Sequence, residues 1–241
     1  MAGVGAASAS GSAATGLCVA MLAGTALALV HAFVCVGLRA DPIVSGLALV
    51  FLGTGLSSVL GAPLVSLGSS VPRFEDVPIP LLSGLPFLGP VLFRHSALVY
   101  GSVLLAVLLH LGLTRTRPGL AVIACGENPE AAAALGIPWR RVRCACVASG
   151  GALAGMAGGM LSLCVTPGWV EGMTAGQGWI ALGVVIVARW NPLYAVGAAW
   201  IFGMVRRLPL DLQGLDVPFF QDPNVGFFLN MLPYLATVAV L

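Results

Sequence analysis

Side chains that could perform enzymatic chemistry are scarce in this 241-residue sequence. Its 11 Lys and Arg residues are all arginine, and a chain without lysine can build neither the phosphate site of a P-loop nor a Schiff base. The six cysteines form no CxxC pair, and no histidine stands at metal-ligand spacing. We therefore expect no catalytic residue, no metal site and no cofactor, so the chain is not predicted to be an enzyme.

Uncharged polar residues inside apolar stretches could instead bind a small polar solute by hydrogen bonds. Polar groups in membrane helices tend to face the interior of the bundle rather than lipid. The candidates for such a solute pathway are Ser45, Thr54, Ser57, Gln177 and Asn230. For each of them, a hydrogen bond within or between helices remains the alternative.

A short polar segment, residues 128–136, has the pattern of a capped helix. Asn128 is a favourable N-cap, and Pro129 and Glu130 suit the first helical turn. Four alanines follow, and Gly136 can adopt the left-handed conformation that ends a helix. At about 1.5 Å per residue the helix is too short to span a membrane. It is either a connector or a surface helix that fits a groove on another protein.

These residues belong to a strongly apolar chain, with 59% hydrophobic residues, 8% charged residues and a mean hydropathy of +1.00. A soluble domain carries about 25% charged residues, and a membrane-spanning helix needs about 20 apolar residues. We predict an all-α, polytopic transmembrane helical bundle that forms a single domain over residues 1–241. It has about five full spans and a broken helical hairpin. The full spans are 17–38, 43–60, 97–113, 144–165 and 226–241.

The hairpin is predicted from two shorter apolar pieces, 179–188 and 193–205, separated by residues 189–192. One interpretation is a hairpin whose tip points toward the cytoplasm. The other is a single span that is kinked at Pro192.

Arginines in the short loops predict the orientation of the spans. Arg39 and the segment 114–143, which holds five further arginines, lie on the same side, and we assign that side to the cytoplasm. The loop 61–96 is then external. Its polar residues Arg73, Glu75 and Asp76 could meet a substrate-binding protein, although an ordinary solvated loop is the alternative.

This orientation places the N-terminus outside, yet residues 1–16 contain no basic residue that could form a signal peptide. We therefore expect that an odd number of further helices precedes Met1.

Three glycines in the predicted span 144–165 are spaced four residues apart, so they lie on one face of that helix. They are Gly151, Gly155 and Gly159. Small residues at this spacing let two helices approach closely. The contact could lie within the chain or between two subunits.

The order of residues in the segment 128–136 resembles the E-A-A-x-x-x-G pattern with which permeases of ATP-binding-cassette importers dock on their ATPase. The matching residues are Glu130, Ala131, Ala132 and Gly136. Further blocks in the same order make the sequence similar to the nucleoside and simple-sugar branch of the ribose and branched-chain amino acid permease superfamily. They are 43–47, 149–158, 176–182, 189–192, 202–203 and 232–234. The resemblance covers about residues 17–241, but Val50 stands where many relatives have asparagine.

The resemblance implies a multi-pass permease subunit in a bacterial inner membrane. The implied partners are an ATP-binding-cassette ATPase, a second homologous permease, a substrate-binding lipoprotein and membrane lipid, with no nucleic acid. Coupling to the ATPase would be carried by Asn128, Pro129, Glu130, Ala131, Ala132 and Gly136. The implied solute is a nucleoside, with riboflavin or a simple sugar as other candidates.

The alternative is a self-contained secondary transporter or channel. A carrier driven by protons or sodium ions usually places ionisable groups within its spans. The predicted spans contain no carboxylate away from their ends, which favours energy supplied by a partner.

Overall fold

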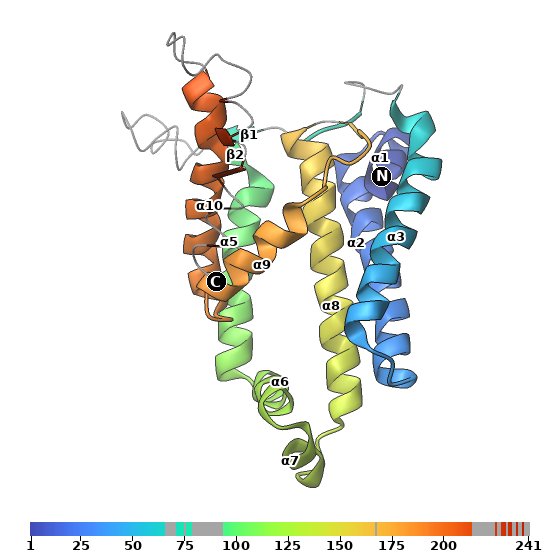
Figure 1. Ribbon diagram of the computed structural model, residues 1–241, viewed down its shortest axis with the longest axis vertical. Helices are drawn as coiled ribbons and strands as arrows, with labels where there is room; N and C mark the ends of the chain where they lie inside the picture. Colours follow the sequence, from blue (N-terminus) through green and yellow to red (C-terminus); the bar gives the residue numbers. More distant parts are fainter. Residues whose placement is uncertain are drawn as a thin grey trace. The chain divides into compact units, whose positions relative to one another are not determined.

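The computed structural model describes residues 1–65, 71–74, 76–78, 94–166 and 168–213, with isolated positions between 225 and 238. Asn230 and Glu75, and most of the predicted span 226–241, lie outside the described residues. In chain order the elements are α1 (Ala2–Ser10), α2 (Ala13–Ala32), the π-helical turn η1 (Phe33–Gly37), α3 (Pro42–Gly61), β1 (Asp76–Pro78), β2 (Arg94–Ser96), α5 (Ala97–Arg115), α6 (Arg117–Glu127), α7 (Pro129–Ala134), α8 (Trp139–Met160), the π-helical turn η3 (Leu161–Val165), α9 (Gln177–Val187) and α10 (Pro192–Gln213) (Figure 1).

Four helical segments in the described part of the chain are long and apolar enough to cross a membrane. They are Ala13–Gly37, Pro42–Val65, Ala97–Arg115 and Trp139–Val165. These segments correspond to the first four predicted spans, and the predicted all-α polytopic class is confirmed. Helix α3 exposes most of its large apolar side chains and α5 exposes half of them, as expected for surfaces that face lipid or another subunit.

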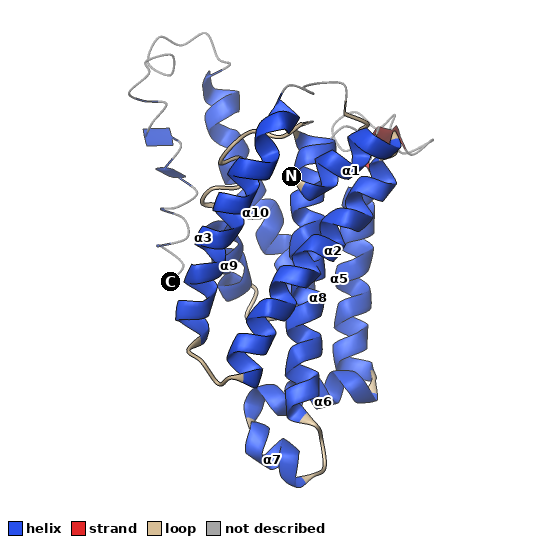
Figure 2. Cartoon of the chain, turned by 90° about the vertical axis from the view of Figure 1, so that its right-hand side faces the viewer, coloured by secondary structure: helices blue, strands red, loops and turns tan. Residues whose placement is uncertain are grey.

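The chain folds as two compact units, Met1–Gly101 with Leu113–Met173 and Ser102–Gly112 with Thr174–Leu241. The first unit is built around α2 and α8, which run antiparallel in close contact (Figure 2). Gly24 of α2 lies against Gly151 and Gly155 of α8, and Leu17 of α2 lies against Gly159. The three glycines therefore face α2 within the chain.

The contact between α2 and α8 leaves no room for side chains at its centre. A Cβ atom added to Gly151 would lie 2.6 Å from the carbonyl oxygen of Gly24. One added to Gly155 would lie 2.9 Å from the carbonyl carbon of Ala20, which is also backbone. Such close backbone approach supplies the van der Waals contact that holds membrane helices together, because lipid offers no hydrophobic driving force between them.

Helix α1 forms a tight hairpin with α2. This hairpin was not predicted from the sequence of residues 1–16. Gly11, with φ of 69°, turns the chain between the two helices, and a Cβ atom added to Gly3 would lie 3.0 Å from the carbonyl oxygen of Gly16. Val4 and Ala7 of α1 are fully buried in a cluster with Leu163 of η3 and Trp169. The α1 hairpin thus covers one end of the α2–α8 pair.

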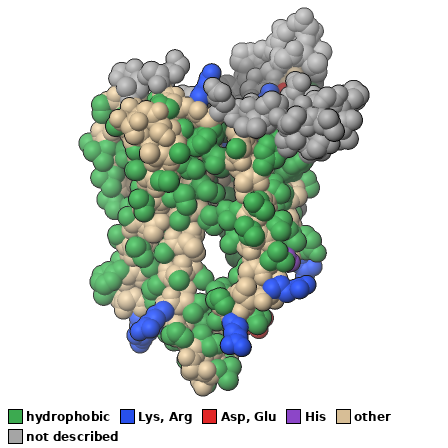
Figure 3. All heavy atoms as spheres, turned by 180° about the vertical axis from the view of Figure 1, so that it is seen from behind, with side chains coloured by type: hydrophobic (Ala, Val, Ile, Leu, Met, Phe, Trp, Pro, Cys, Tyr) green, Lys and Arg blue, Asp and Glu red, His purple; other side chains and the backbone are tan. Residues whose placement is uncertain are grey.

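The other end of the first unit carries α6, α7 and the predicted cytoplasmic arginines. Helix α2 ends and α8 begins at this end, so Arg39 and Arg140 come to the same side although they are about 100 residues apart. Figure 3 shows arginine side chains around this end. These arginines therefore lie at one end of the unit, and the assignment of that end to the cytoplasm stays a prediction.

The second unit contains a helical hairpin made of α9 and α10, whose chain direction reverses between them (Figure 1). Arg189 and Trp190 adopt positive φ values of 49° and 62°, which produce the reversal. Asn191 then accepts a hydrogen bond from the backbone N–H of Leu193 at 3.0 Å. The chain therefore forms a hairpin here rather than a single span kinked at Pro192, and the cytoplasmic position of its tip stays a prediction.

Candidate functional site

The connection between α5 and α8 contains two helices where the sequence analysis predicted one. Helix α6 begins after Thr116, whose Oγ1 accepts a hydrogen bond from the N–H of Gly119 at 3.2 Å. Pro118 lies in the first turn, where its missing N–H costs no helical hydrogen bond. Thr116 as an N-cap and Pro118 in the first turn could have predicted α6 from the sequence, but this helix was not predicted.

Helix α7 has the caps that the sequence predicted. Asn128 Oδ1 accepts hydrogen bonds from the N–H groups of Glu130 and Ala131, both at 3.0 Å. At the other end Gly136 has φ of +80°, and its N–H donates to the carbonyl of Ala133 at 2.9 Å while the N–H of Ile137 donates to Ala132 at 3.0 Å. These two bonds form a Schellman motif, which ends a helix with its last carbonyls satisfied.

One side of α7 is packed and the other is open. Ala132 is 2% exposed, and α7 contacts both α6 and α8. Glu130, Ala131 and Leu135 are exposed, and the side chain of Leu135 reaches 80%. Figure 2 shows α7 beyond the ends of the long helices of its unit. The segment therefore offers a short helix with an acidic residue and a fully exposed leucine to a partner.

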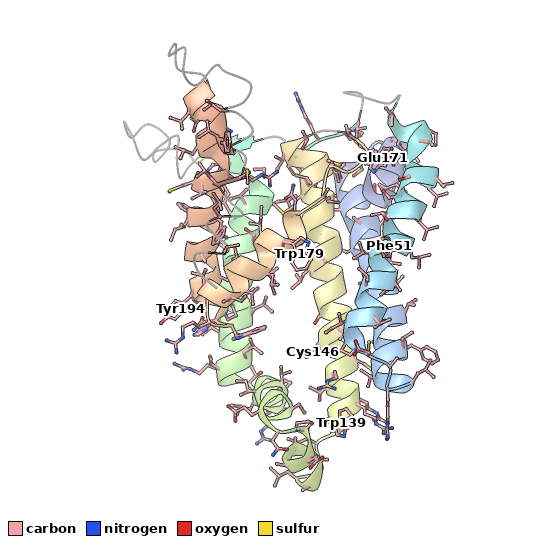
Figure 4. The ribbon with its side chains drawn as sticks, viewed as in Figure 1. Phe51, Trp139, Cys146, Glu171, Trp179 and Tyr194 are labelled. Carbon is pink, nitrogen blue, oxygen red and sulfur yellow. The ribbon has the colours of Figure 1, made fainter. Side chains whose placement is uncertain are left out.

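Arginines flank this helix at the start of α8. Trp139 lies at the foot of α8 (Figure 4), and the guanidinium carbons of Arg140 and Arg143 lie 5.4 and 5.6 Å from the centre of its ring. Cations at a helix N-terminus oppose the helix dipole, and contact with the ring face offsets part of that cost. The surface beside α7 is therefore positively charged.

The residues predicted to line a solute pathway do not form one cluster. Ser45 is buried, and its Oγ lies 3.0 Å from Nδ1 of His31. Ser57 lies twelve residues further along α3, about 18 Å away at 1.5 Å per residue. The hydroxyl of Thr54 donates to the backbone of its own helix, to Val50 O at 2.9 Å. The candidates on α3 therefore lie at different positions along the helix axis and do not form one binding site.

Gln177, the candidate in the second unit, accepts a hydrogen bond at Oε1 from a guanidinium nitrogen of Arg206 at 2.9 Å. Arg206 was not among the site residues predicted from the sequence. The signal that could have found it is a basic residue directly after the apolar piece 193–205, because charges in membrane helices are costly and usually have a function.

At the α1 end of the first unit, the segment after η3 closes over α3. Trp169 is 6% exposed, and its indole N–H donates to Ser57 Oγ at 3.3 Å. The hydroxyl of Ser58 donates to Glu171 Oε1 at 2.6 Å, and Figure 4 shows Glu171 near the end of α3. Two serines of α3 are thus held by one connecting segment.

Replacing Gly61 with alanine should loosen this closure. A Cβ atom at Gly61 would lie 2.5 Å from the indole ring of Trp169, so the ring must move and its bond to Ser57 is lost. Overpacking of this kind costs about 1–3 kcal/mol. The thermal midpoint of the purified protein in detergent should fall for Gly61→Ala. Gly55→Ala, on the same helix with open space around it, should keep the midpoint or raise it, because alanine has a better helix propensity than glycine. Equal midpoints for both variants would contradict this prediction.

Metal binding finds no support in the described ranges, where no group of three or more His, Cys, Asp or Glu residues lies close enough to hold an ion.

Comparison with known proteins shows that most of the chain is similar to membrane transport components. The sequence profile of the family described as branched-chain amino acid transport system / permease component matches residues 1–233. No solved structure matches the chain.

Three relatives show the extent of the similarity. A protein of Haloferax volcanii, provisionally named as a glucose ABC transporter permease, is 37% identical over an alignment that covers 94% of this chain and 73% of that protein. The guanosine ABC transporter permease of Bacillus subtilis is 32% identical over 93% of this chain and 71% of its own length. The nucleoside ABC transporter permease of Lactococcus lactis is 33% identical over 91% and 69%.

Proposed function

Because the chain belongs to the family of branched-chain amino acid transport system permease components, we propose that it forms the membrane pathway of an ATP-driven importer for nucleoside-like solutes. A member of this family is a multi-pass protein of the inner membrane and a transport component rather than an enzyme. ATP hydrolysis then takes place on a separate ATPase subunit. The rest of the proposal concerns the coupling segment, the solute and the other partners.

Helix α7 is the observation that carries the coupling proposal. It is capped at both ends by Asn128 and Gly136, and its exposed side presents Glu130 and Leu135. An exposed large apolar side chain beside a charged one is typical of an anchor that enters a pocket on a partner. In this proposal the pocket lies on the ATPase, and Asn128, Pro129, Glu130, Ala131, Ala132 and Gly136 form the docking helix.

Force from the ATPase would reach the membrane through α8. Helix α7 contacts α6 and α8, and α8 is packed on α2 along Gly151, Gly155 and Gly159. Because backbone lies against backbone there, α2 and α8 would move together when α7 is displaced. Movement of this pair would open the pathway to one side of the membrane and close it to the other.

The solute class rests on relatives and on the polar residues of the spans. Two of the three relatives above are named for guanosine or nucleosides, and one for glucose. Ser45, Ser57 and Gln177 offer uncharged hydrogen-bonding groups, which suit a neutral polar solute. A nucleoside is therefore the first candidate, and a simple sugar or riboflavin is the next.

The remaining partners follow from the architecture that importers of this class require. We propose a second homologous permease beside this chain, a lipoprotein that delivers the solute from outside, and lipid around the exposed faces of α3 and α5. No nucleic acid is expected as a partner.

The test is uptake by the reconstituted complex. The chain would be purified together with its ATPase, second permease and lipoprotein, and proteoliposomes would be supplied with radiolabelled guanosine. We expect uptake that requires ATP, stops when the ATPase is inactivated, and persists when ionophores collapse all ion gradients. Uptake that needs an ion gradient and no ATPase would instead establish a secondary transporter. Competition by unlabelled adenosine, glucose and riboflavin would identify the solute class.

A further inference from the structure

Helix α10 carries two consecutive arginines that lie in different surroundings. Ala198 and Phe202, which are 4% and 5% exposed, define its buried face. Arg206 lies four residues after Phe202 on the same side of the helix; it is itself exposed, and it donates a hydrogen bond to Gln177 of α9 at 2.9 Å. Arg207 lies one residue further and forms an ion pair with Asp211 at 3.3 Å, with side chains 72% and 63% exposed. The two arginines therefore point to different sides of the helix.

Among the described residues, no carboxylate forms an ion pair with Arg206. Within the described residues the one ion pair of the chain joins Arg207 to Asp211, and Arg206 meets the neutral amide of Gln177. The hydrogen bond to Gln177 uses one of the five N–H donors of a guanidinium group. A charged group in this situation is stable only where water or a polar ligand can reach it.

The hairpin places this pair deep in the membrane. Arg189, Trp190 and Tyr194 lie at or next to the tip of the hairpin, with Trp190 79% and Tyr194 64% exposed (Figure 4 labels Tyr194), and these residue types are enriched at the membrane interface. Helix α9 rises about 16 Å over its 11 residues from the tip to Gln177. Arg206 lies about 21 Å along α10 from Pro192. In a hydrocarbon core about 30 Å thick, a hairpin whose tip is at the interface then keeps Gln177 and Arg206 inside the core.

We propose that Arg206, positioned by Gln177, lines the water-filled solute pathway and donates hydrogen bonds to oxygen atoms of the passing solute. The ligand chemistry is a neutral solute that carries carbonyl or hydroxyl oxygens, as nucleosides and sugars do. The fork of N–H donors on a guanidinium matches such acceptors. The inference rests on the proposed function, which it deepens by adding a solute-binding residue.

The first test compares uptake with ATP hydrolysis in the reconstituted complex, with radiolabelled guanosine as the probe. Hydrogen bonds to charged groups contribute about 1.5–3 kcal/mol, so Arg206→Gln should lower the guanosine transported per ATP hydrolysed about 10-fold or more. Arg207→Gln removes the same charge at the neighbouring position and should leave the ratio within about 2-fold. A ratio that is unchanged in Arg206→Gln, or lowered equally in both variants, would overturn the proposal.

A second variant separates solute binding from a structural role. Gln177→Glu keeps a partner for Arg206 and makes it an ion pair, so the hairpin should assemble normally. The guanidinium is then held by a carboxylate and should donate less well to the solute, which again lowers guanosine transported per ATP. If the pair only stabilises the hairpin, Gln177→Glu should transport as the natural protein does, and the proposal is wrong.

Chemical labelling tests water access without any solute. In a background in which the six cysteines are replaced by alanine, Arg206→Cys should react with a charged, membrane-impermeant thiol reagent. Met204→Cys, on an exposed part of the same helix that we assign to lipid, should not. If neither Arg206→Cys nor Met204→Cys reacts with the reagent, the proposal is overturned. A natural complex that takes up no guanosine would count against the proposed function alone, and the labelling would still decide whether Arg206 faces water.

Discussion

Replacing Gly155 with valine is expected to prevent the first unit from folding into a stable form. A side chain at this position would have to enter the backbone of α2, where the Cα atom of Met21 would lie 3.0 Å from the new Cβ atom. Backbone cannot rotate away as a side chain can, so the two helices must separate along their whole contact. The cost should reach or exceed the upper end of the 1–3 kcal/mol that is typical of overpacking.

Gly158→Val is the matched control for this prediction. Gly158 lies three residues along the same helix with no atom within 4 Å of its Cβ position, and valine has a better helix propensity than glycine. In fluorescence-detected size-exclusion chromatography, Gly155→Val should give aggregated or degraded protein. Gly158→Val should elute as the natural protein does. Similar elution profiles and thermal midpoints for the two variants would show that the α2–α8 contact does not control stability.

The second large effect is expected at the end of α7. Gly136 has φ of +80°, where a residue with a branched Cβ is strained, so Gly136→Val should unwind the Schellman motif and displace Leu135. The transport subunit should still insert and fold, because α7 lies outside the α2–α8 contact. We expect co-purification with the ATPase and ATP-driven guanosine uptake to fall at least 10-fold.

The control variant is Gly136→Asn, because asparagine tolerates the left-handed backbone conformation better than other residues with a side chain. Gly136→Asn can keep the same backbone conformation and should retain most of the uptake, although it adds a side chain at the same place. Gly126→Ala, at the end of α6 with open space around it, should have no effect. If Gly136→Val assembles and transports as well as Gly136→Asn, then the shape of α7 is not what the ATPase recognises.

The features that could be predicted from the sequence are those that depend on neighbouring residues. The four spans follow from the length of apolar segments, and α7 follows from Asn128 and Gly136, whose cap bonds join residues at most five apart. The break between α9 and α10 is marked by Asn191 and Pro192 for the same reason. Hydrophobicity and capping are local properties, and they fix where helices begin and end.

The features that could not be predicted are contacts between distant residues. Trp169 reaches Ser57 across 112 positions, and Arg206 reaches Gln177 across 29. Nothing in the local sequence of Ser57 indicates that it accepts an indole N–H rather than a bond from solute. Helix α1 was missed because its nine residues are mostly small and lack a polar cap, so its stability comes from packing on α2. The glycine spacing predicted a close contact, but only the fold identifies α2 as its partner.

The α2–α8 contact also sets the scale of motion that a partner could transmit. From Trp139 to Val165 the helix and its terminal π-helical turn contain 27 residues, a rod about 40 Å long. Gly151 and Gly155 lie close to its midpoint. When α8 tilts together with α2 about this point by roughly 5°, each end of α8 moves by about 2 Å and the two ends move in opposite directions, because each arm is about 20 Å long. One end carries α7, and the other leads into the segment with Trp169 and Glu171. A displacement of about 2 Å at α7 would therefore produce a displacement of similar size, in the opposite direction, in the segment that holds Ser57 and Ser58.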